Sequence, residues 1–225
     1  MVGRYKIEIE LLSEAIFGSG YSIPGSVDLE VVYGNYGLPY MKAKTFKGNL
    51  REHMEDSVTI LKNCYNRDFS DELNKLLGKE NSGIIAWGSI KLSDCCIQEN
   101  IKNFFAYAVE NNEIYAKEIR DALKEVRSFT AIEDDGSYKD RSLRQARVIR
   151  RGPKLYSDIY CERSLSDREL AILALSVSSM RHIGSMRTRG KGEVRLRLLL
   201  SENGRWSDKT DYYIDKLMEE VKKVE

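Results

Sequence analysis

The sequence is poor in proline, in histidine and in cysteine patterns that bind metal. Among 225 residues there are 3 prolines, 2 histidines and 4 cysteines, and the cysteines, at positions 64, 95, 96 and 161, form no C-x-x-C pair. No Ser/Pro-rich linker and no internal repeat interrupts the chain. A zinc site is therefore not expected, and the cysteines are expected to be reduced thiols of a cytoplasmic protein.

Long apolar runs are also missing. The longest nearly apolar stretch, residues 171–177, is far shorter than the roughly 20 residues that span a bilayer. Residues 1–10 alternate with charges where a signal peptide would be apolar. No contact with a membrane is expected. A hydrophobic content of 42% and an aromatic content of 9% indicate a globular protein, long enough for one domain with an insertion.

Net charge is almost absent from the chain as a whole but is segregated along it. The total is +1. Residues 141–197 contain 12 arginines and 2 lysines against 5 acidic residues, a local net charge of +9. Residues 51–135 contain 11 basic and 17 acidic residues, a local net charge of −6. Concentrated arginine on a neutral protein is typical of a face that binds phosphates.

The hydrophobic pattern predicts an α+β protein. Residues 5–11 alternate apolar and charged side chains, as a strand with one buried face does. Apolar residues at steps of three and four predict a helix from about Thr45 to Leu61, and the capping box Ser166–Glu169 opens another that extends to about Arg181. Further elements are predicted as strands at 143–149, 155–161 and 194–198 and as a final helix at 212–224.

These elements follow one another as strand, helix, strands, helix and strand. That order is the ferredoxin-like (RRM-like) pattern, which implies an antiparallel sheet with packed helices. The middle of the chain is less regular, with a short helix predicted at 69–77, a strand or hairpin at 84–92, and helices or irregular segments at 101–127. Its acidic bias indicates a lobe inserted after the first helix, at about residues 63–128 of a single domain spanning residues 1–225.

A glycine-rich loop precedes the last predicted strand. Its glycines would let the main chain approach a ligand, and its basic side chains would donate to phosphate oxygens. The residues concerned are Gly184, Arg187, Arg189, Gly190, Lys191 and Gly192. The spacing is not that of a Walker A loop, which disfavours nucleotide hydrolysis. The alternative is an ordinary turn from helix to strand with solvated basic residues.

A second basic group lies at the start of the first predicted helix. Lys44, Lys47 and Arg51 are three and four residues apart, so they share one face of that helix near its N-terminus. Backbone N–H groups at a helix N-terminus also favour an anion, so this face could hold phosphates. A solvated charged face is the alternative.

Two widely separated motifs together resemble one family. Gly37-Leu-Pro-Tyr40 leads into Thr45-Phe-Lys-Gly-Asn-Leu-Arg51, and the loop 184–192 stands before the last strand; this combination resembles the RAMP superfamily of CRISPR-associated proteins. Residues 127–152 are similar to the segment that type III effector backbone subunits carry between the insertion and the late strands. The resemblance covers most of the chain and rests on the order and spacing of loose motifs.

The resemblance implies a Csm-like or Cmr-like backbone subunit of a type III CRISPR effector complex, which acts in antiviral defence. Such a subunit binds guide RNA without base preference, self-associates along it beside other CRISPR effector subunits, and positions complementary target RNA. It also implies an endoribonuclease that cleaves the paired target, with a divalent cation, Mg²⁺, as the cofactor.

The resemblance extends to individual residues. Asp28 stands where such subunits carry the aspartate required for target cleavage, and Glu30 is a second candidate. Phe129, Thr130 and Ile132 would belong to a thumb-like projection that wedges between base pairs. From the residues alone, Asp28 could equally cap a turn or satisfy a backbone amide, and the apolar thumb residues could pack in the core.

Two other functions stay open. One is a non-catalytic RNA-binding scaffold of the same superfamily, in which Asp28 only shapes its loop. The other is a metal-independent RAMP endoribonuclease that processes precursor guide RNA. Two-histidine chemistry would need His53 and His182 at one phosphate, and their positions within and at the end of predicted helices favour packing or surface roles instead.

Overall fold

The main sheet is antiparallel and mixes early and late strands of the chain. The structure is a computed structural model that describes residues 4–79, 88–131, 133–137, 139 and 142–222. Its main sheet contains β1 (Arg4–Leu11), β2 (Ile90–Leu92), β3 (Cys96–Ile97), β6 (Lys154–Cys161), β7 (Val194–Glu202) and β8 (Arg205–Asp208). The strand order is β2-β6-β1-β7-β8, with β3 also paired to β6.

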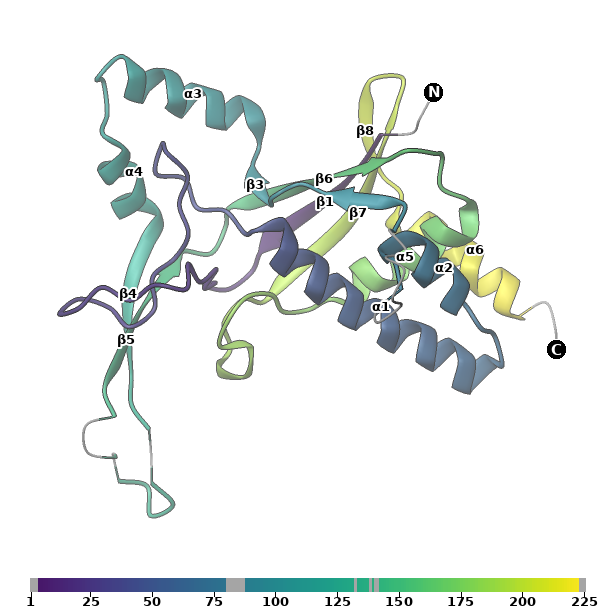
Figure 1. Cartoon of the computed structure of the whole chain (residues 1–225), viewed down its shortest axis with the longest axis horizontal. Coiled ribbons are helices and arrows are strands. Elements are labelled where there is room, and N and C mark those ends of the chain that lie inside the picture. The colour runs from purple at the N-terminus through teal and green to yellow at the C-terminus, as the bar shows by residue number, and fades with distance from the viewer. Residues whose placement is uncertain (1–3, 80–87, 132, 138, 140–141, 223–225) are drawn as a thin grey trace.

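Four helices cover one face of this sheet (Figure 1). They are α1 (Ala43–Tyr65), α2 (Ser70–Leu77), α5 (Asp167–Ser179) and α6 (Thr210–Lys222). The order β1-α1-β2-β6-α5-β7 in the chain, with β2-β6-β1-β7 across the sheet, confirms the predicted ferredoxin-like fold. Among the helices of the described residues, none is both long and apolar enough to cross a membrane.

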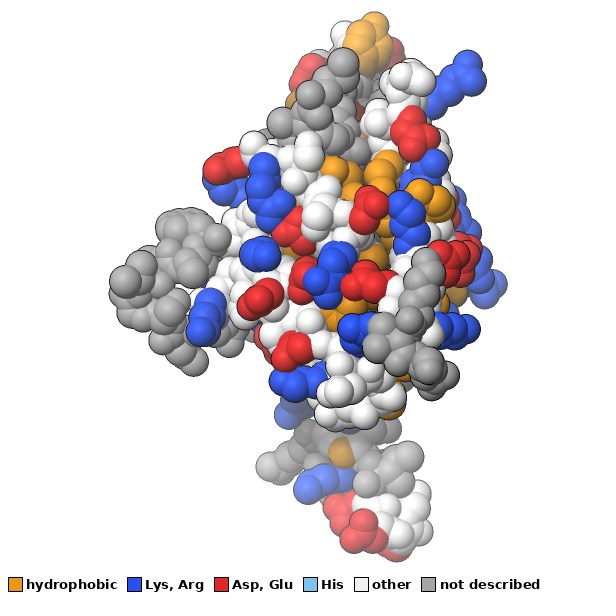
Figure 2. All heavy atoms as spheres, turned by 90° about the vertical axis from the view of Figure 1, so that its right-hand side faces the viewer, with side chains coloured by type: hydrophobic (Ala, Val, Ile, Leu, Met, Phe, Trp, Pro, Cys, Tyr) orange, Lys and Arg blue, Asp and Glu red, His pale blue; other side chains and the backbone are white. Residues whose placement is uncertain are grey.

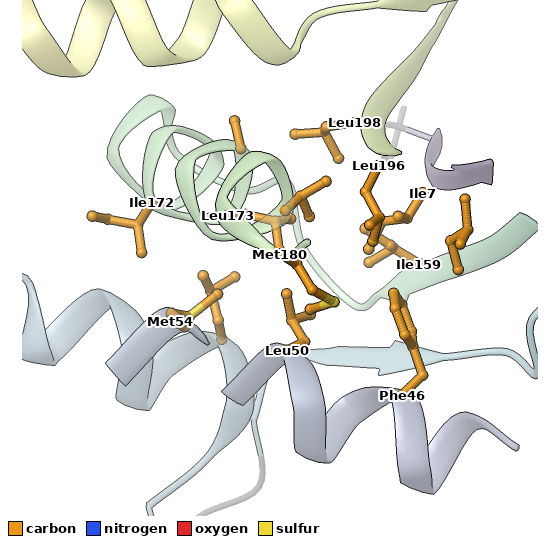
Figure 3. Packing of buried hydrophobic residues seen from close by; sticks show 14 of the residues in the cluster. Ile7, Phe46, Leu50, Met54, Ile159, Ile172, Leu173, Met180, Leu196 and Leu198 are labelled. Atoms are coloured by element: carbon orange, nitrogen blue, oxygen red, sulfur yellow. The ribbon is translucent and has the colours of Figure 1, made fainter. Parts of the chain in front are cut away.

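The core lies between these helices and the apolar side of the sheet. Figure 3 shows Phe46 of α1 pointing toward Ile159 of β6, and Leu50 of α1 pointing toward Met180 at the end of α5. The alternation predicted for the first strand is confirmed, because its apolar residues are buried on this side: Tyr5, Ile7, Ile9 and Leu11. The predicted capping box is also present, since the Ser166 and Glu169 side chains each accept a hydrogen bond from the other's backbone N–H.

The part of the chain that stands apart from the sheet differs from the expected lobe at 63–128. It comprises α3 (Glu99–Glu110), α4 (Ala116–Leu123) and a two-stranded sheet of β4 (Lys124–Phe129) and β5 (Arg144–Ile149). Residues 69–77 instead belong to the core, because Phe69, Leu73 and Leu76 are buried there. The strand predicted at 143–149 corresponds to β5, which pairs with β4, and the hairpin projects away from the body (Figure 1).

A long irregular segment connects β1 to α1. Residues 17–25 and 27–33 fold onto each other through isolated bridges, Gly18 with Val31 and Ile23 with Val27. Leu29 also forms a parallel bridge with Ala146 of β5. The segment therefore joins the main sheet to the base of the hairpin.

Candidate nucleic-acid interface

The glycines of the loop at 184–192 allow it to pack against the segment that follows β1. Gly184 and Gly192 have positive φ values of 82° and 73°. A Cβ atom on Gly184 would lie 2.5 Å from the Ile16 carbonyl oxygen, and one on Gly192 would lie 1.9 Å from the Ile183 carbonyl oxygen. These two glycines thus serve close approach of the protein's own backbone. Gly190 is exposed, with no atom near its missing side chain.

The basic side chains of this loop have different environments. Lys191 and Arg127 of β4 both pair with Glu14, and the Arg127 guanidinium, followed by Lys191, lowers the pKa of that carboxyl from 4.5 to about 2. Arg187 pairs with Glu52 of α1, with 3.4 Å between Nη1 and Oε2. Arg189 is exposed and has no ion pair with any of the described residues. The loop therefore contacts α1, the segment after β1 and the hairpin.

A basic hollow of about 530 Å³ lies between the glycine-rich loop and the part of the hairpin where β4 ends at Phe129 and β5 begins at Arg144. We call it the cationic hollow. It brings the predicted Arg189 together with the predicted Phe129 and Thr130, and the remaining lining is Ala131, Lys139, Ser142, Arg144 and Met186. Three of these described residues are cations and none is acidic. Ile132, the third predicted thumb residue, lies outside the described residues.

Basic and acidic side chains lie in different parts of the hairpin. Lys139 and Arg144 line the cationic hollow, whereas the exposed residues toward the tip include Glu133, Asp134 and Asp135. Negative side chains repel phosphate, so the part of the hairpin around Phe129 and Arg144 suits a nucleic-acid backbone better than the tip does. Phe129 is half-buried beside these cations, which gives the hollow an aromatic edge.

The basic face predicted on α1 contains one exposed cation and two that are partly buried. Lys44 is exposed, while Lys47 is half-buried and its pKa is lowered by burial and then by the charge of Arg51. Arg51 donates hydrogen bonds to the Leu77 and Gly78 carbonyl oxygens at 2.8 Å, so it binds the C-terminal end of α2. The three residues do share a helix face, and Arg51 has a structural role there.

Asp28 is fixed to β5 at Gln145, the residue that follows Arg144 of the cationic hollow. Its backbone N–H donates to the Gln145 carbonyl oxygen, and its Oδ2 atom accepts from the Gln145 backbone N–H, both at 2.8 Å. The residue as a whole is exposed. Gln145 directly follows Arg144 in the sequence, so Asp28 binds the neighbour of a residue that lines the hollow and does not itself line it.

Glu30 is less available for chemistry. Arg147 of β5 forms an ion pair with its Oε2 atom, and its Oε1 atom accepts from the Val31 backbone N–H at 3.1 Å. Arg147 also donates to the Ser26 hydroxyl at 3.3 Å. The Arg147 side chain therefore holds the segment on both sides of Asp28 against β5.

A divalent cation would have to depend on Asp28 together with ligands from outside the chain. Among the residues that the structure describes, no three His, Cys, Asp or Glu side chains are grouped as metal ligands. Mg²⁺ is commonly held by one or two carboxylates with phosphate oxygens and water completing its shell. The exposed Asp28 residue, bonded next to a lining residue of the cation-lined hollow, is compatible with that mode.

Several arginines of residues 141–197 lie away from the cationic hollow. Our expectation that this basic segment forms one face is therefore wrong in part. Arg163 pairs with Glu169 at the start of α5, and Arg168 pairs with Glu72 of α2 and Glu220 of α6. Arg195 pairs with Glu10, and Arg197 pairs with Glu8, on the side of the sheet that faces away from the helices. Figure 2 views the molecule from the side of α2 and α6 and shows basic and acidic side chains intermingled there.

Lys139 and Arg144 were missed as candidates from the sequence. Both occur in residues 139–151, where six basic residues accompany one acidic residue, and this local density was the available signal. The two histidines contribute nothing to the hollow: His53 lies in α1, and His182 bridges to Glu193 after α5. Their interpretation as packing or surface residues stays a prediction.

The fold and the cationic hollow define the chain as a ferredoxin-like α+β protein with a basic, nucleic-acid-compatible face. A family model for the RAMP superfamily matches residues 8–195, and the chain belongs to that family. A search of curated proteins gave no match.

Two solved structures share the fold. One is a chain of the type III-B Cmr-beta complex bound to cognate target RNA, with a TM-score of 0.60, 14% identity, and coverage of 94% of this chain and 98% of that one. The other is from the apo state of Cmr-beta, with a TM-score of 0.60, 15% identity, and coverage of 93% and 98%.

Proposed function

We propose that the protein is an RNA-binding backbone subunit of a type III CRISPR effector complex. The observation that carries the proposal is the cationic hollow, in which Lys139, Arg144 and Arg189 meet from two segments far apart in the sequence. Membership of the RAMP superfamily and the fold shared with Cmr-beta chains, one of them in a complex with cognate target RNA, support it.

The hollow suits recognition of an RNA backbone rather than of base sequence. Its guanidinium and ammonium groups can donate to phosphate oxygens, and the hydroxyls of Thr130 and Ser142 can bond to phosphate or ribose. Phe129 offers a ring edge against which an unstacked base can pack. In the proposed complex, sequence would be read by base pairing between guide RNA and target RNA, while copies of this subunit repeat along the guide.

Target cleavage would take place at Asp28. The 2′-oxygen of the target ribose would attack the adjacent phosphorus, lose its proton, and displace the 5′-oxygen, which gains a proton. The products are a 2′,3′-cyclic phosphate and a 5′-hydroxyl. The Asp28 carboxylate, fixed to β5, would help orient the reacting groups for in-line attack. A divalent cation held there would stabilise the charge that develops on the phosphate.

A non-catalytic scaffold is the second candidate, because one observation favours it. The Asp28 carboxylate already satisfies a backbone N–H, that of Gln145, and this alone gives the residue a structural role. In such a scaffold the same hollow would hold RNA, and Asp28 would only keep its loop on β5.

Filter binding at low salt tests the proposal most simply. The intact chain, incubated with RNA and separately with a polyanion such as heparin, is expected to bind RNA more tightly at equal charge concentration. Equal affinity for both would show that the hollow binds any polyanion without preference for RNA, and would contradict the proposal. Cleavage of an unpaired repeat RNA in EDTA would instead support a metal-independent processing enzyme.

A further inference from the structure

Arg147 of β5 is a cation that the proposed RNA contacts do not use, and its side chain binds the segment that carries Asp28. It does not line the cationic hollow, and only 20% of its side chain is exposed. Its Nη1 atom pairs with Glu30, and its Nη2 atom donates to the Ser26 hydroxyl at 3.3 Å. Its backbone N–H donates to the Leu29 carbonyl oxygen at 2.9 Å. Arg147 therefore contacts the chain both before and after Asp28.

These contacts belong to a short parallel alignment between residues 28–30 and β5. Leu29 bridges to Ala146 in parallel, Asp28 is bonded to the residue before Ala146, and Glu30 pairs with Arg147, the residue after it. Figure 1 shows the chain between β1 and α1 lying against the hairpin at this point. The segment is thus held at two neighbouring places, at Asp28 by backbone groups of β5 and at Glu30 by a side chain of β5.

The ion pair between Arg147 and Glu30 is largely enclosed. The Glu30 side chain is 13% exposed, and its other oxygen, Oε1, accepts from the Val31 backbone N–H at 3.1 Å. Water screens an enclosed pair less than an exposed one, and removal of either partner leaves the other charge without compensation. Glu30 is therefore held more firmly than an exposed ion pair would hold it.

The guanidinium of Arg147 is used for this segment alone. Within the described part of the chain its hydrogen bonds go to Glu30 and Ser26, and its Nε atom has no partner there. A guanidinium presents its donors in a rigid plane, so it can bind two acceptors at a fixed angle, whereas the single ammonium group of a lysine cannot reproduce that geometry. The two acceptors stand on either side of Asp28, so the plane of the guanidinium sets where Asp28 lies.

The proposed cleavage would depend on this placement. In-line attack needs the reacting groups within narrow limits, and a displacement of about 1 Å can cost about a hundredfold in rate. Groups that hold a catalytic side chain in place therefore control the rate without contacting the substrate. Both terminal nitrogens of Arg147 are occupied within the chain, which leaves it no evident role as a phosphate ligand.

We infer that Arg147, through its ion pair with Glu30, is the positioning residue that fixes the Asp28 carboxylate for target cleavage. The inference rests on the proposed function, in which Asp28 is the catalytic group. It gives Glu30, the second catalytic candidate from the sequence, a role in holding the segment and none in the reaction.

Kinetics of the assembled complex test the inference through two conservative variants. Arg147→Lys keeps the positive charge, and Glu30→Gln keeps an acceptor for the Val31 N–H. In each, the single-turnover rate constant for target cleavage at saturation should fall at least about tenfold, while the affinity for target RNA stays within about twofold of the natural complex. The matched control is Arg150→Lys, because Arg150 follows β5 and pairs with Glu125 at 3.2 Å. It should change neither quantity.

Amide hydrogen exchange of the full chain measures the anchoring without any activity. The backbone N–H groups of Asp28 and Leu29 both donate to the Gln145 carbonyl oxygen, at 2.8 and 3.3 Å, so their exchange reports whether the segment stays on β5. In Arg147→Lys both should exchange at least about tenfold faster, whereas the N–H groups of β1 in the main sheet keep their natural rates. Arg150→Lys should leave all of these rates unchanged.

The outcomes separate a failure of this inference from a failure of the proposed function. Natural exchange rates in Arg147→Lys would overturn the inference, since Arg147 would not hold the segment. Faster exchange with natural cleavage would also overturn it, because the contact would then be structural only. A loss of RNA affinity that accounts for the loss of cleavage would show that Arg147 binds RNA instead. These results leave the proposed function intact, whereas natural cleavage by Asp28→Asn would contradict the proposed cleavage site and the inference with it.

Discussion

Asp28 and Gln145 bind each other through two hydrogen bonds of 2.8 Å, one between their backbones and one from the Gln145 N–H to the Asp28 carboxylate. This contact fixes the proposed catalytic carboxylate to β5, next to a residue that lines the cationic hollow. A catalytic subunit and a non-catalytic scaffold would both use it. The structural and chemical roles of Asp28 must therefore be separated by variants that remove one and keep the other.

Replacement of Asp28 by asparagine or by alanine separates these roles. Asparagine can still accept the Gln145 N–H but carries no charge, so Asp28→Asn should keep the free energy of unfolding within about 0.5 kcal/mol. Asp28→Ala should lower it by about 1 kcal/mol through the lost hydrogen bond. Both variants should stop Mg²⁺-dependent target cleavage by the assembled complex while RNA binding is unchanged.

The matched control is Asp211→Asn, which neutralises an exposed carboxylate of α6. It should leave both cleavage and stability unchanged. Full cleavage by Asp28→Asn would show that the carboxylate only holds the loop, and the scaffold function would then be preferred.

The glycine-rich loop predicts a contrast between two similar substitutions. Gly190 and Gly192 both have positive φ values, 70° and 73°, so alanine at either position has a similar backbone cost of about 1 kcal/mol. A Cβ atom at position 192 would also lie 1.9 Å from the Ile183 carbonyl oxygen, whereas position 190 is open. Gly192→Ala should therefore lower the free energy of unfolding by at least about 1 kcal/mol more than Gly190→Ala. Equal values in urea denaturation would contradict the packing described for this loop.

Glu14 predicts a dependence of stability on pH. Its pKa is lowered from 4.5 to about 2 by Arg127 and then Lys191, so its ionised form stabilises the folded state. This contribution is fully present above about pH 4.5 and is lost as the pH falls through about 2. Glu14→Gln should thus be less stable than the natural chain at pH 7, and the difference should shrink between pH 4.5 and 2. A constant difference across urea titrations in that range would contradict the assignment.

The same substitution should affect RNA binding. Glu14 pairs with Lys191 and with Arg127, and Arg127 also pairs with Glu125, so neutralisation of Glu14 makes Lys191 available to phosphate. Each new phosphate contact should steepen the log–log salt dependence of the binding constant by about 0.7 for single-stranded RNA. The control is Glu169→Gln: the pKa of Glu169 is also lowered to about 2, by Arg163, but it lies at the start of α5. It should cost stability without changing RNA binding. If both variants change RNA binding alike, Glu14 has no specific role.

Much of the fold could be predicted because its main signals are local. The alternation in β1 and the capping box of α5 are properties of short segments, and both occur as predicted. By contrast, β2 has only three residues, Ile90–Leu92, and belongs to the core only because β6 pairs with it. The sequence also does not determine which strand pairs with β5, because β4 and β6 are both close to it in the chain. Which strands pair is decided by tertiary packing.

The site was predictable to a smaller extent, and for a similar reason. The sequence predicted that Arg189 and the thumb residues bind RNA, and the structure brings Arg189, Phe129 and Thr130 to one hollow, while their contact with RNA stays a prediction. The sequence could not show which arginines are neutralised. Arg197 pairs with Glu8, 189 positions away along the chain, and Lys154 pairs with the same carboxylate from a third strand. Such pairings depend on sheet register, which composition does not reveal.

The salt dependence of RNA binding by two triple variants tests the central claim most directly. The first, Lys139→Ala with Arg144→Ala and Arg189→Ala, removes the cations of the hollow; the second, Arg163→Ala with Arg195→Ala and Arg197→Ala, removes the same charge from ion pairs elsewhere. The hollow variant should bind RNA more weakly, with a log–log salt slope shallower by about 2, at about 0.7 per lost contact, while the second keeps the natural slope. Equal slopes for the two variants, or a loss confined to the second, would contradict the account.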